Sequence, residues 1–276
     1  MEINRRKFIM LTAATAGSIM APAAWAQGNV STLDTIIEKG RLNIGVTEAP
    51  PWFSKNPMTG KWTGVGIMLG QRLADDLGVK LNMVETTWQN AVSALLANQI
   101  DVMFILDPTP ERRKAIDFPK EPLFYYALGV LVEQTSHAKT WEDLNKSTTN
   151  IAVTMGTSFA ATVTKKLPEA SILRFASNDE AVAAFASGRA NAVAQYAPAL
   201  TVQYARLKMG KVIIPTPVHP IPTSAGIRKG SPAFSAWLSD KFRQYKAAHL
   251  PEKYFDDYLK SVHVNPADVP NVIMSS

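Results

Sequence analysis

Residues Asp101 to Phe118 read DVMFILDPTPERRKAIDF and contain the clearest change from strand to helix in the chain. The apolar run Val102–Leu106 predicts a buried strand. A proline directly after Asp107 ends that strand, and Thr109 precedes a second proline, which is the pattern of a capped helix start. Asp107, Thr109 and Arg112 are therefore expected together at the carboxyl end of a strand, where open α/β sheets bind their ligands.

The rest of the chain alternates short apolar runs with amphipathic helical patterns, which is typical of an α/β fold with a mostly parallel sheet. Leu42 to Thr47 predicts the first strand, and Val65 to Leu77 predicts a helix that Gly78 ends. A polar stretch follows Val132, and a second series of strands and helices begins near Trp141. With 276 residues, the chain is long enough for two lobes that each have a core.

The composition excludes several classes of function. The net charge is +6, but the basic residues form no long run, so we expect no nucleic-acid partner. The chain has no cysteine, which excludes disulfides, thiolate metal sites and a lipid on an N-terminal cysteine. Its 4 histidines are far apart and lack the spacing of metal ligands. The sequence has no phosphate-binding loop and no nucleophile elbow, so we expect neither a cofactor nor a metal.

Residues 1–26 are expected to be an export signal and not part of the fold. Arg5, Arg6 and Lys7 precede an apolar run, and Ala24-Trp25-Ala26 has the small residues of a cleavage site. The paired arginines resemble the twin-arginine signal, although export by the general route stays open. No later segment has about 18 uninterrupted apolar residues, so we expect no integral membrane protein. These features predict a periplasmic, soluble protein without a lipid anchor.

Short segments along the chain resemble those of one family in both their order and their spacing. They are GRLNIGV (40–46), PW (51–52), WQNAVSAL (88–95), IDVM (100–103), TPERRKAIDF (109–118), VTMGT (153–157) and ANAV (190–193). With these segments, the chain resembles the extracellular solute-binding proteins of ABC importers, in the family that binds polar amino acids.

The resemblance implies a two-lobed α/β periplasmic binding protein fold, type II-like, with two crossing hinge strands and the ligand cleft between the lobes. The lobes of this family close on the ligand by hinge motion. The crossings are expected near residues 128–133 and 224–228. Lobe 1 then comprises residues 27–131 and 226–276, and lobe 2 comprises residues 132–225.

The resemblance also implies a set of ligand-binding residues. Trp52 or one of its neighbours, together with Trp88, matches the two aromatic residues that hold the ligand between them in the family. Arg112 matches the arginine that binds the α-carboxylate of the ligand, a role that suits the planar guanidinium group. Thr157 and Ser158 begin a helix whose free N–H groups are expected to receive the same carboxylate.

Two positions depart from the family pattern and leave the identity of the ligand open. Asp107 stands where the family has a threonine or serine, and it can contact a ligand, cap the helix or do both. Tyr196, preceded by Gln195, stands where the family has the aspartate that pairs with the α-ammonium group. Either Asp107 binds that ammonium group in a turned amino acid, or the ligand is another small polar or cationic molecule. Glu48, together with the aromatic residues near it, suits a cation.

The resemblance implies a periplasmic receptor that captures a small solute and presents it to a membrane ABC permease. We expect it to act as a monomer, without a cofactor and without catalysing a reaction. Two alternatives remain open. Some dehydratases that act on cyclic carboxylic acids resemble this family, and such an enzyme needs a protonated carboxyl group, for which Glu48 or Asp107 would have to serve. The other alternative is an accessory or sensing protein that uses the same fold without transport.

Overall fold

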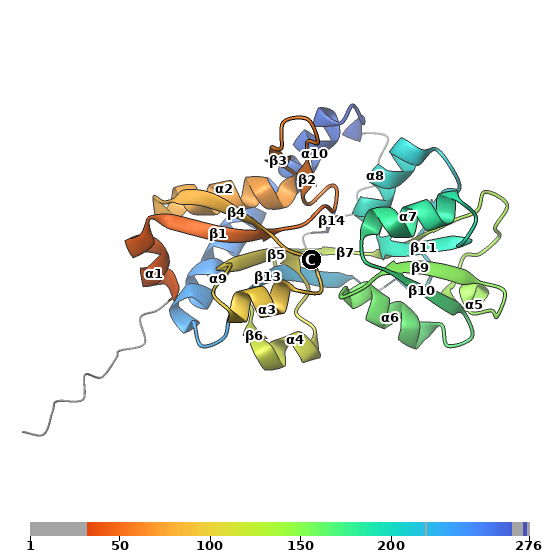
Figure 1. The fold of residues 1–276 in the computed structure, drawn as a ribbon, viewed down its shortest axis with the longest axis horizontal. Coiled ribbons are helices and arrows are strands. Elements are labelled where there is room, and N and C mark those ends of the chain that lie inside the picture. Colours follow the sequence, from red (N-terminus) through yellow and green to blue (C-terminus); the bar gives the residue numbers. More distant parts are fainter. Residues whose placement is uncertain (1–31, 219, 267–272, 275–276) are drawn as a thin grey trace, which may run out of the picture. The chain divides into compact units, whose positions relative to one another are not determined.

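The computed structural model describes residues 32–218, 220–266 and 273–274. The predicted export signal, residues 1–26, lies outside the described residues. Among the residues described, no helix combines the length and the apolar character that crossing a membrane requires. Strands and helices alternate through this part of the chain, which confirms the predicted α/β class (Figure 1). The expectation of a mostly parallel sheet is wrong, because both sheets combine parallel with antiparallel pairs of strands.

The first sheet has seven strands within the described residues, in the order β14-β7-β13-β5-β1-β4, with β6 paired to β13. They are β1 (Arg41–Val46), β4 (Lys80–Glu85), β5 (Val102–Leu106), β6 (Ile116–Asp117), β7 (Phe124–Tyr126), β13 (Ile221–Arg228) and β14 (Ile273–Met274). β1 pairs in parallel with β4 and β5, whereas β13 runs antiparallel to β5. Because β5 lies between β1 and β13, all of its residues are buried, as its apolar sequence predicts.

The second sheet has five strands in the described part of the chain, in the order β10-β9-β11-β8-β12. They are β8 (Leu128–Val132), β9 (Asn150–Thr154), β10 (Ser171–Phe175), β11 (Ala192–Tyr196) and β12 (Lys211–Ile213). β9 pairs in parallel with β10 and β11, and β8 runs antiparallel to β11 and β12. A separate hairpin consists of β2 (Ser54–Lys55) and β3 (Trp62–Thr63).

Each sheet has its own helices (Figure 1). Those with the first sheet are α1 (Thr32–Lys39), α2 (Val65–Leu77), α3 (Ala91–Leu96), α4 (Pro110–Ala115), α9 (Pro232–Ala247) and α10 (Leu250–Ser261). Those with the second sheet are α5 (Trp141–Leu144), α6 (Ser158–Lys166), α7 (Asn178–Ala186) and α8 (Ala197–Leu207). The predicted end of α2 at Gly78 is confirmed, since this residue has a φ of 67°, which glycine adopts without strain.

The chain changes from one sheet to the other at Ala127 and again between β12 and β13. β8 pairs over its whole length with β11, and β13 pairs with β5 and β7, so neither strand is shared between the sheets. The changes of sheet therefore lie a few residues earlier than the predicted crossings at 128–133 and 224–228. The sequence hides the first change because Ala127 lies in a continuously buried apolar stretch. The division into lobe 1, residues 27–131 and 226–276, and lobe 2, residues 132–225, stays a proposal.

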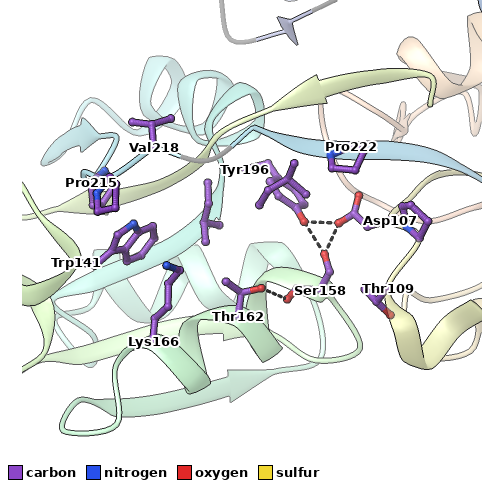
Figure 2. Close-up of a pocket in the computed structure, with 14 residues that line it drawn as sticks. Asp107, Thr109, Trp141, Ser158, Thr162, Lys166, Tyr196, Pro215, Val218 and Pro222 are labelled. Carbon is purple, nitrogen blue, oxygen red and sulfur yellow. Dashed lines mark hydrogen bonds between the residues drawn. The ribbon is translucent and has the colours of Figure 1, made fainter. Parts of the chain in front are cut away.

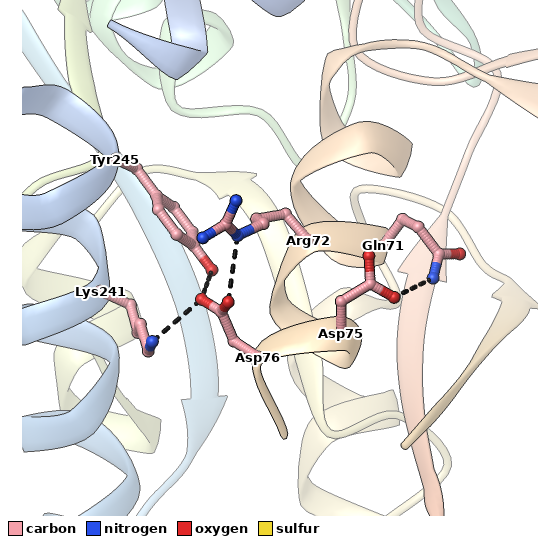
Figure 3. A network of polar contacts seen from close by, with 6 residues as sticks. All are labelled: Gln71, Arg72, Asp75, Asp76, Lys241 and Tyr245. Atoms are coloured by element: carbon pink, nitrogen blue, oxygen red, sulfur yellow. Dashed lines mark hydrogen bonds and ion pairs between the residues drawn. The ribbon is translucent and has the colours of Figure 1, made fainter. Parts of the chain in front are cut away.

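One polar cluster joins α2 to α9 (Figure 3). The carboxylate of Asp76, whose side chain is 12% exposed, accepts hydrogen bonds from Arg72 at 3.0 Å and from the hydroxyl of Tyr245 at 2.8 Å. The ammonium group of Lys241 lies 3.0 Å from the same carboxylate. Burial raises the pKa of Asp76, but the hydrogen bonds from Lys241 and Tyr245 and the charges of Lys241 and Arg72 outweigh burial, so the pKa lies below its ordinary value.

We expect Asp76→Asn to lower the free energy of unfolding by about 1.5–3 kcal/mol at neutral pH, because hydrogen bonds to a charged group are lost. The matched control is Asp75→Asn, since the exposed side chain of Asp75 accepts a hydrogen bond from Gln71 on the same helix, at 2.8 Å, and joins no other helix among the described residues. The pair of Gln71 and Asp75 contributes about 0.2–0.5 kcal/mol to the free energy of unfolding. The measurement is urea unfolding of both variants, and equal losses would show that the cluster does not join the helices.

The same comparison has a defined pH dependence. A lowered pKa in the folded state means that the ionised Asp76 stabilises the fold fully above its ordinary pKa of about 3.9. This stabilisation is lost as the pH falls through the lower pKa of the folded protein. The difference between the wild type and Asp76→Asn should therefore decrease below about pH 4.

Candidate functional site

Asp107 lies directly after β5, and only 4% of its surface is exposed. Two residues earlier, Ile105 has a φ of 57°, which is rare for a β-branched residue. The pairing of β5 with β13 shifts at this place, between Ser224 and Ala225. Such a bulge re-aims the side chains that follow it, and backbone strain of this kind, about 1–3 kcal/mol, is concentrated at functional sites.

Three hydroxyl groups donate hydrogen bonds to the carboxylate of Asp107. Tyr126 of β7 donates to Oδ1 at 2.5 Å. Tyr196 at the end of β11 and Ser158 at the start of α6 both donate to Oδ2, and their own hydroxyl oxygens lie 2.5 Å apart. Figure 2 shows the triangle formed by Asp107, Tyr196 and Ser158. Because Tyr196 and Ser158 belong to the second sheet and its helices, one buried carboxylate connects the two halves of the molecule.

Both phenols that donate to Asp107 keep their protons. Burial raises the pKa of Tyr126 well above its ordinary value, and the negative charge of Asp107 raises it further. The same two causes, in the same order, raise the pKa of Tyr196. The two tyrosines are therefore protonated hydrogen-bond donors at neutral pH.

Aromatic rings from both sheets pack beside this carboxylate. The ring centroids of Tyr126 and Tyr196 are 3.8 Å apart with an interplanar angle of 33°. Phe159 of α6 meets Tyr196 edge-on at 5.3 Å, and Trp52 lies 6.0 Å from Tyr126. Trp52 also stacks on Phe124 at 5.5 Å and is 3% exposed. The rings fill the space between the ends of β7 and β11.

Arg112 spans the two sheets with its guanidinium group. Its Nη1 donates to the carbonyl oxygen of Asp107 at 3.0 Å, and its Nη2 donates to that of Gly156 at 2.8 Å. The predicted cap at Thr109 is confirmed, since its hydroxyl accepts a hydrogen bond from the backbone N–H of Arg112 at 3.2 Å. The cap fixes the first turn of α4 and thereby the direction in which Arg112 points.

A cavity of about 30 Å³ lies among these residues. Of the predicted site residues, it is lined by Trp52, Trp88, Asp107, Arg112, Thr157, Ser158, Gln195 and Tyr196. Gln195 is 4% exposed, and its side-chain oxygen Oε1 has no hydrogen-bond partner among the described residues. A buried acceptor without a partner is unfavourable unless a ligand or water supplies a donor. The structure thus brings eight of the predicted residues together.

Glu48 is the predicted site residue that the structure does not bring to this cavity. Its carboxylate accepts hydrogen bonds from the backbone N–H of Lys55 at 2.8 Å and from the hydroxyl of Ser54 at 3.2 Å. It therefore holds the beginning of the β2–β3 hairpin. Within the described residues, no group of three or more His, Cys, Asp or Glu side chains is arranged to hold a metal ion.

Sequence reasoning missed four residues that line the same cavity: Ile105, Tyr126, Phe159 and Asn178. Tyr126 belongs to the aromatic run Phe124–Tyr126, which is visible in the sequence, but such a run by itself indicates a strand and not a binding site. Phe159 follows Ser158 in the helix start, where apolar residues usually belong to the core. No sequence signal marks Ile105, because isoleucine is among the residues least expected at a positive φ.

Comparison with known proteins finds relatives among the solute-binding proteins of bacteria. Residues 42–261 match the family of bacterial extracellular solute-binding proteins, family 3. The chain is 26% identical over 265 residues to the ABC transporter glutamine-binding protein GlnH of Bacillus subtilis (strain 168), covering 94% of this chain and 95% of that protein. An ancestral amino acid-binding protein, described as a precursor of cyclohexadienyl dehydratase, is 33% identical with a TM-score of 0.75, over 83% of this chain and 99% of that chain. The solute receptor for L-cysteine of Neisseria gonorrhoeae is 25% identical with a TM-score of 0.78, over 89% and 100%.

These findings confirm two predictions made from the sequence. The two-lobed α/β fold is that of the solved relatives. The role of solute-binding component of an ABC importer agrees with the family and with the relative from Bacillus subtilis. The chain belongs to the bacterial extracellular solute-binding proteins of family 3.

Proposed function

We propose that the protein captures a small polar solute, an amino acid or a related compound, between its two sheets and presents it to a membrane ABC permease. The site is the cavity beside Asp107. One observation carries the proposal: a guanidinium group, a buried carboxylate and an amide oxygen without a partner, from Arg112, Asp107 and Gln195, line the same cavity.

These three groups complement a molecule with one negative and one positive pole. Two of the five N–H donors of Arg112 are used by carbonyl oxygens, which leaves donors for a carboxylate. The free Oε1 of Gln195 is an acceptor for an ammonium group, and it lies next in sequence to Tyr196, where the family has an aspartate. The carboxylate of Asp107 supplies negative charge for the same ammonium group. The half-buried ring of Trp88, packed 6.1 Å from Phe53, forms a wall.

The size of the cavity sets a condition on binding. A volume of about 30 Å³ has room for water molecules, which need about 10–15 Å³ each, but ligand pockets usually have about 300–1,000 Å³. A solute therefore enters only when the ring of Tyr196 separates from that of Tyr126. Because Tyr196 belongs to the second sheet and Tyr126 to the first, hinge opening achieves this separation in one movement.

The remaining expectations belong to the same proposal. We propose that residues 1–26 direct export, through the twin-arginine route, to the periplasm, where the protein acts as a monomer without a lipid anchor or a cofactor. The partners are then the solute and the permease. The paired arginines and the cleavage pattern of the sequence support export, and the family name, which describes extracellular proteins, supports the compartment.

A dehydratase is the second candidate function, because one solved relative is described as a precursor of such an enzyme. It would require a carboxyl group that gives a proton to the substrate. Asp107 accepts three hydrogen bonds and Glu48 accepts two, which occupies both as acceptors. The geometry therefore favours a receptor. Conversion of a bound cyclic carboxylic acid, followed by chromatography, would support the enzyme instead.

A thermal-shift screen of the purified protein with amino acids, amines and small organic acids tests the proposed function. A solute at 100 times its dissociation constant stabilises the fold by about 2.7 kcal/mol. For a chain of this size, that raises the melting temperature by about 5–10 °C. The proposal expects at least one such solute, and the amino-acid class would be wrong if only other compounds gave a shift.

Arg112→Ala is expected to weaken binding of the solute found in this screen by about 10- to 100-fold, which corresponds to the loss of hydrogen bonds to a charged group worth about 1.5–3 kcal/mol. The matched control is Arg113→Ala. Arg113 is exposed, donates to the carbonyl oxygen of Pro108 at 3.2 Å and lies outside the cavity. The measurement is isothermal titration calorimetry. Unchanged affinity in Arg112→Ala would remove this residue from the site.

A further inference from the structure

A second and larger cavity, of about 330 Å³, has Asp107, Tyr196 and Ser158 in its wall (Figure 2). Its volume falls within the usual range of ligand pockets, about 300–1,000 Å³. None of Trp52, Trp88, Arg112 and Gln195 lines it. It therefore differs from the site of the proposed function, although both cavities share Asp107, Ser158 and Tyr196 in their walls.

Most of the wall of this cavity is apolar. The proline rings belong to residues 108, 215, 217 and 222, and Leu128, Val218 and Ile221 complete the aliphatic part. The indole of Trp141, which is 8% exposed, forms a flat surface inside it. Rings and short branched chains bind to such a wall with little loss of conformational freedom, because proline and tryptophan side chains are already fixed.

The polar groups of the wall are mostly used within the protein. Thr162 donates to the carbonyl oxygen of Ser158 at 3.0 Å, and Ser158 and Tyr196 donate to Asp107. Lys166 is different. Its ammonium group lies 5.8 Å from the ring centroid of Trp141, and no described carboxylate lies within 4.0 Å of it. Lys166 is the only cation among the described residues that line this cavity.

The positive charge of Lys166 and the negative charge of Asp107, both in the wall of this cavity, restrict the ligand further. One carboxylate pairs with Lys166, whereas a second one would meet the negative charge of Asp107. An α-ammonium group lies next to the carboxylate in an amino acid, so it would be held close to the ammonium group of Lys166 and repelled. We propose that this cavity binds a small monocarboxylate with an aromatic or branched aliphatic body, in preference to the α-amino acid of the same shape.

Isothermal titration calorimetry with two matched pairs of ligands tests this proposal: 3-phenylpropionate against phenylalanine, and 4-methylpentanoate against leucine. For the full-length wild-type protein, we expect each carboxylate to bind at least about tenfold more tightly than its amino acid. Lys166→Gln should weaken carboxylate binding by about tenfold. Lys165→Gln is the matched control, because Lys165 is an exposed neighbour on the same helix that does not line the cavity.

A further variant locates the ligand. Trp88→Leu changes a wall of the smaller cavity only, so carboxylate binding should stay within about twofold of the wild type. Loss of binding in Trp88→Leu but not in Lys166→Gln would overturn the proposal, because the carboxylate would then lie in the smaller cavity. It would also be overturned if neither carboxylate bound, if the amino acids bound more tightly, or if Lys165→Gln and Lys166→Gln had equal effects.

Discussion

Gly156→Ala is expected to prevent the two halves of the molecule from reaching the closed arrangement. Gly156 lies before α6 with a φ of 75°, and a Cβ atom on it would stand 2.5 Å from the Cα and 2.6 Å from the backbone nitrogen of Gln89. Both partners are backbone atoms, so neither side can yield alone. The hydrogen bond from Arg112 to the Gly156 carbonyl, at 2.8 Å, would be lost with the contact.

The matched control for this variant is Gly188→Ala. Gly188 has a φ of 74°, but an added Cβ atom would have no other atom within 4 Å. Both substitutions place an alanine in the left-handed region of φ, which costs about 1–2 kcal/mol. Only Gly156→Ala also blocks the approach to the backbone of Gln89. If closure fell to about 1% of the population, the apparent dissociation constant of any solute held by the closed form would rise about 100-fold.

The absence of cysteine makes the measurement direct. Ser93 on α3 and Lys165 on α6 are exposed, so cysteines at these two positions carry spin labels at unique sites. Double electron–electron resonance then measures the distance between the two spin labels, and so between α3 and α6. We expect a longer distance in Gly156→Ala than in Gly188→Ala and the wild type. Equal distances in all three proteins would show that Gly156 does not control closure.

Asp107→Ala is expected to have the largest effect on stability. It removes the acceptor of three hydroxyl groups, and Tyr126 and Tyr196 are too deeply buried to find water instead. A buried donor without a partner costs about 1–3 kcal/mol, so Tyr126 alone predicts a loss of that size, and the hydrogen bonds that Tyr196 and Ser158 lose to the carboxylate add to it. That is a large part of the total stability of a typical domain, about 5–15 kcal/mol.

Two comparisons separate this explanation from a simple loss of packing. Asp107→Asn keeps the shape and one acceptor oxygen, and it should destabilise by about 1–2 kcal/mol, measured by urea unfolding. In the Asp107→Ala background, Tyr196→Phe should cost less stability than in the wild type, because the hydroxyl has already lost its bond to the carboxylate and keeps only the Ser158 hydroxyl, 2.5 Å away. If Tyr196→Phe cost the same in both backgrounds, the hydroxyl and the carboxylate would not be coupled.

The sequence predicts those parts of the fold that depend on residues close together in the chain. The strand Val102–Leu106, the cap at Thr109 and the end of α2 at Gly78 depend on apolar runs, a hydroxyl and a glycine that act on their immediate neighbours. The change of sheet at Ala127 depends instead on which strands pair, and pairing of distant segments leaves no local mark. This is why the structure places that change earlier than the sequence indicated.

The candidate site shows the same division. Arg112 was predicted because it matches the arginine of a segment that resembles the family, and Asp107 because it follows a buried strand and departs from the family pattern; both line the cavity. The bulge at Ile105 and the stacking of Tyr126 on Tyr196 join residues far apart in the sequence, so periodicity and propensity could not indicate them. Glu48 was predicted from its charge and the aromatic residues near it in the sequence, and its carboxylate instead holds the nearby hairpin.

The central claim is that the two halves close on a small solute at Asp107. The most direct test is the distance between labels at Ser93 and Lys165 in the otherwise wild-type protein, measured without and with a solute that raises the melting temperature. The proposed function predicts that the solute increases the population with the shorter distance, and that Asp107→Ala abolishes this response. A distribution of distances that no stabilising solute changes would contradict it.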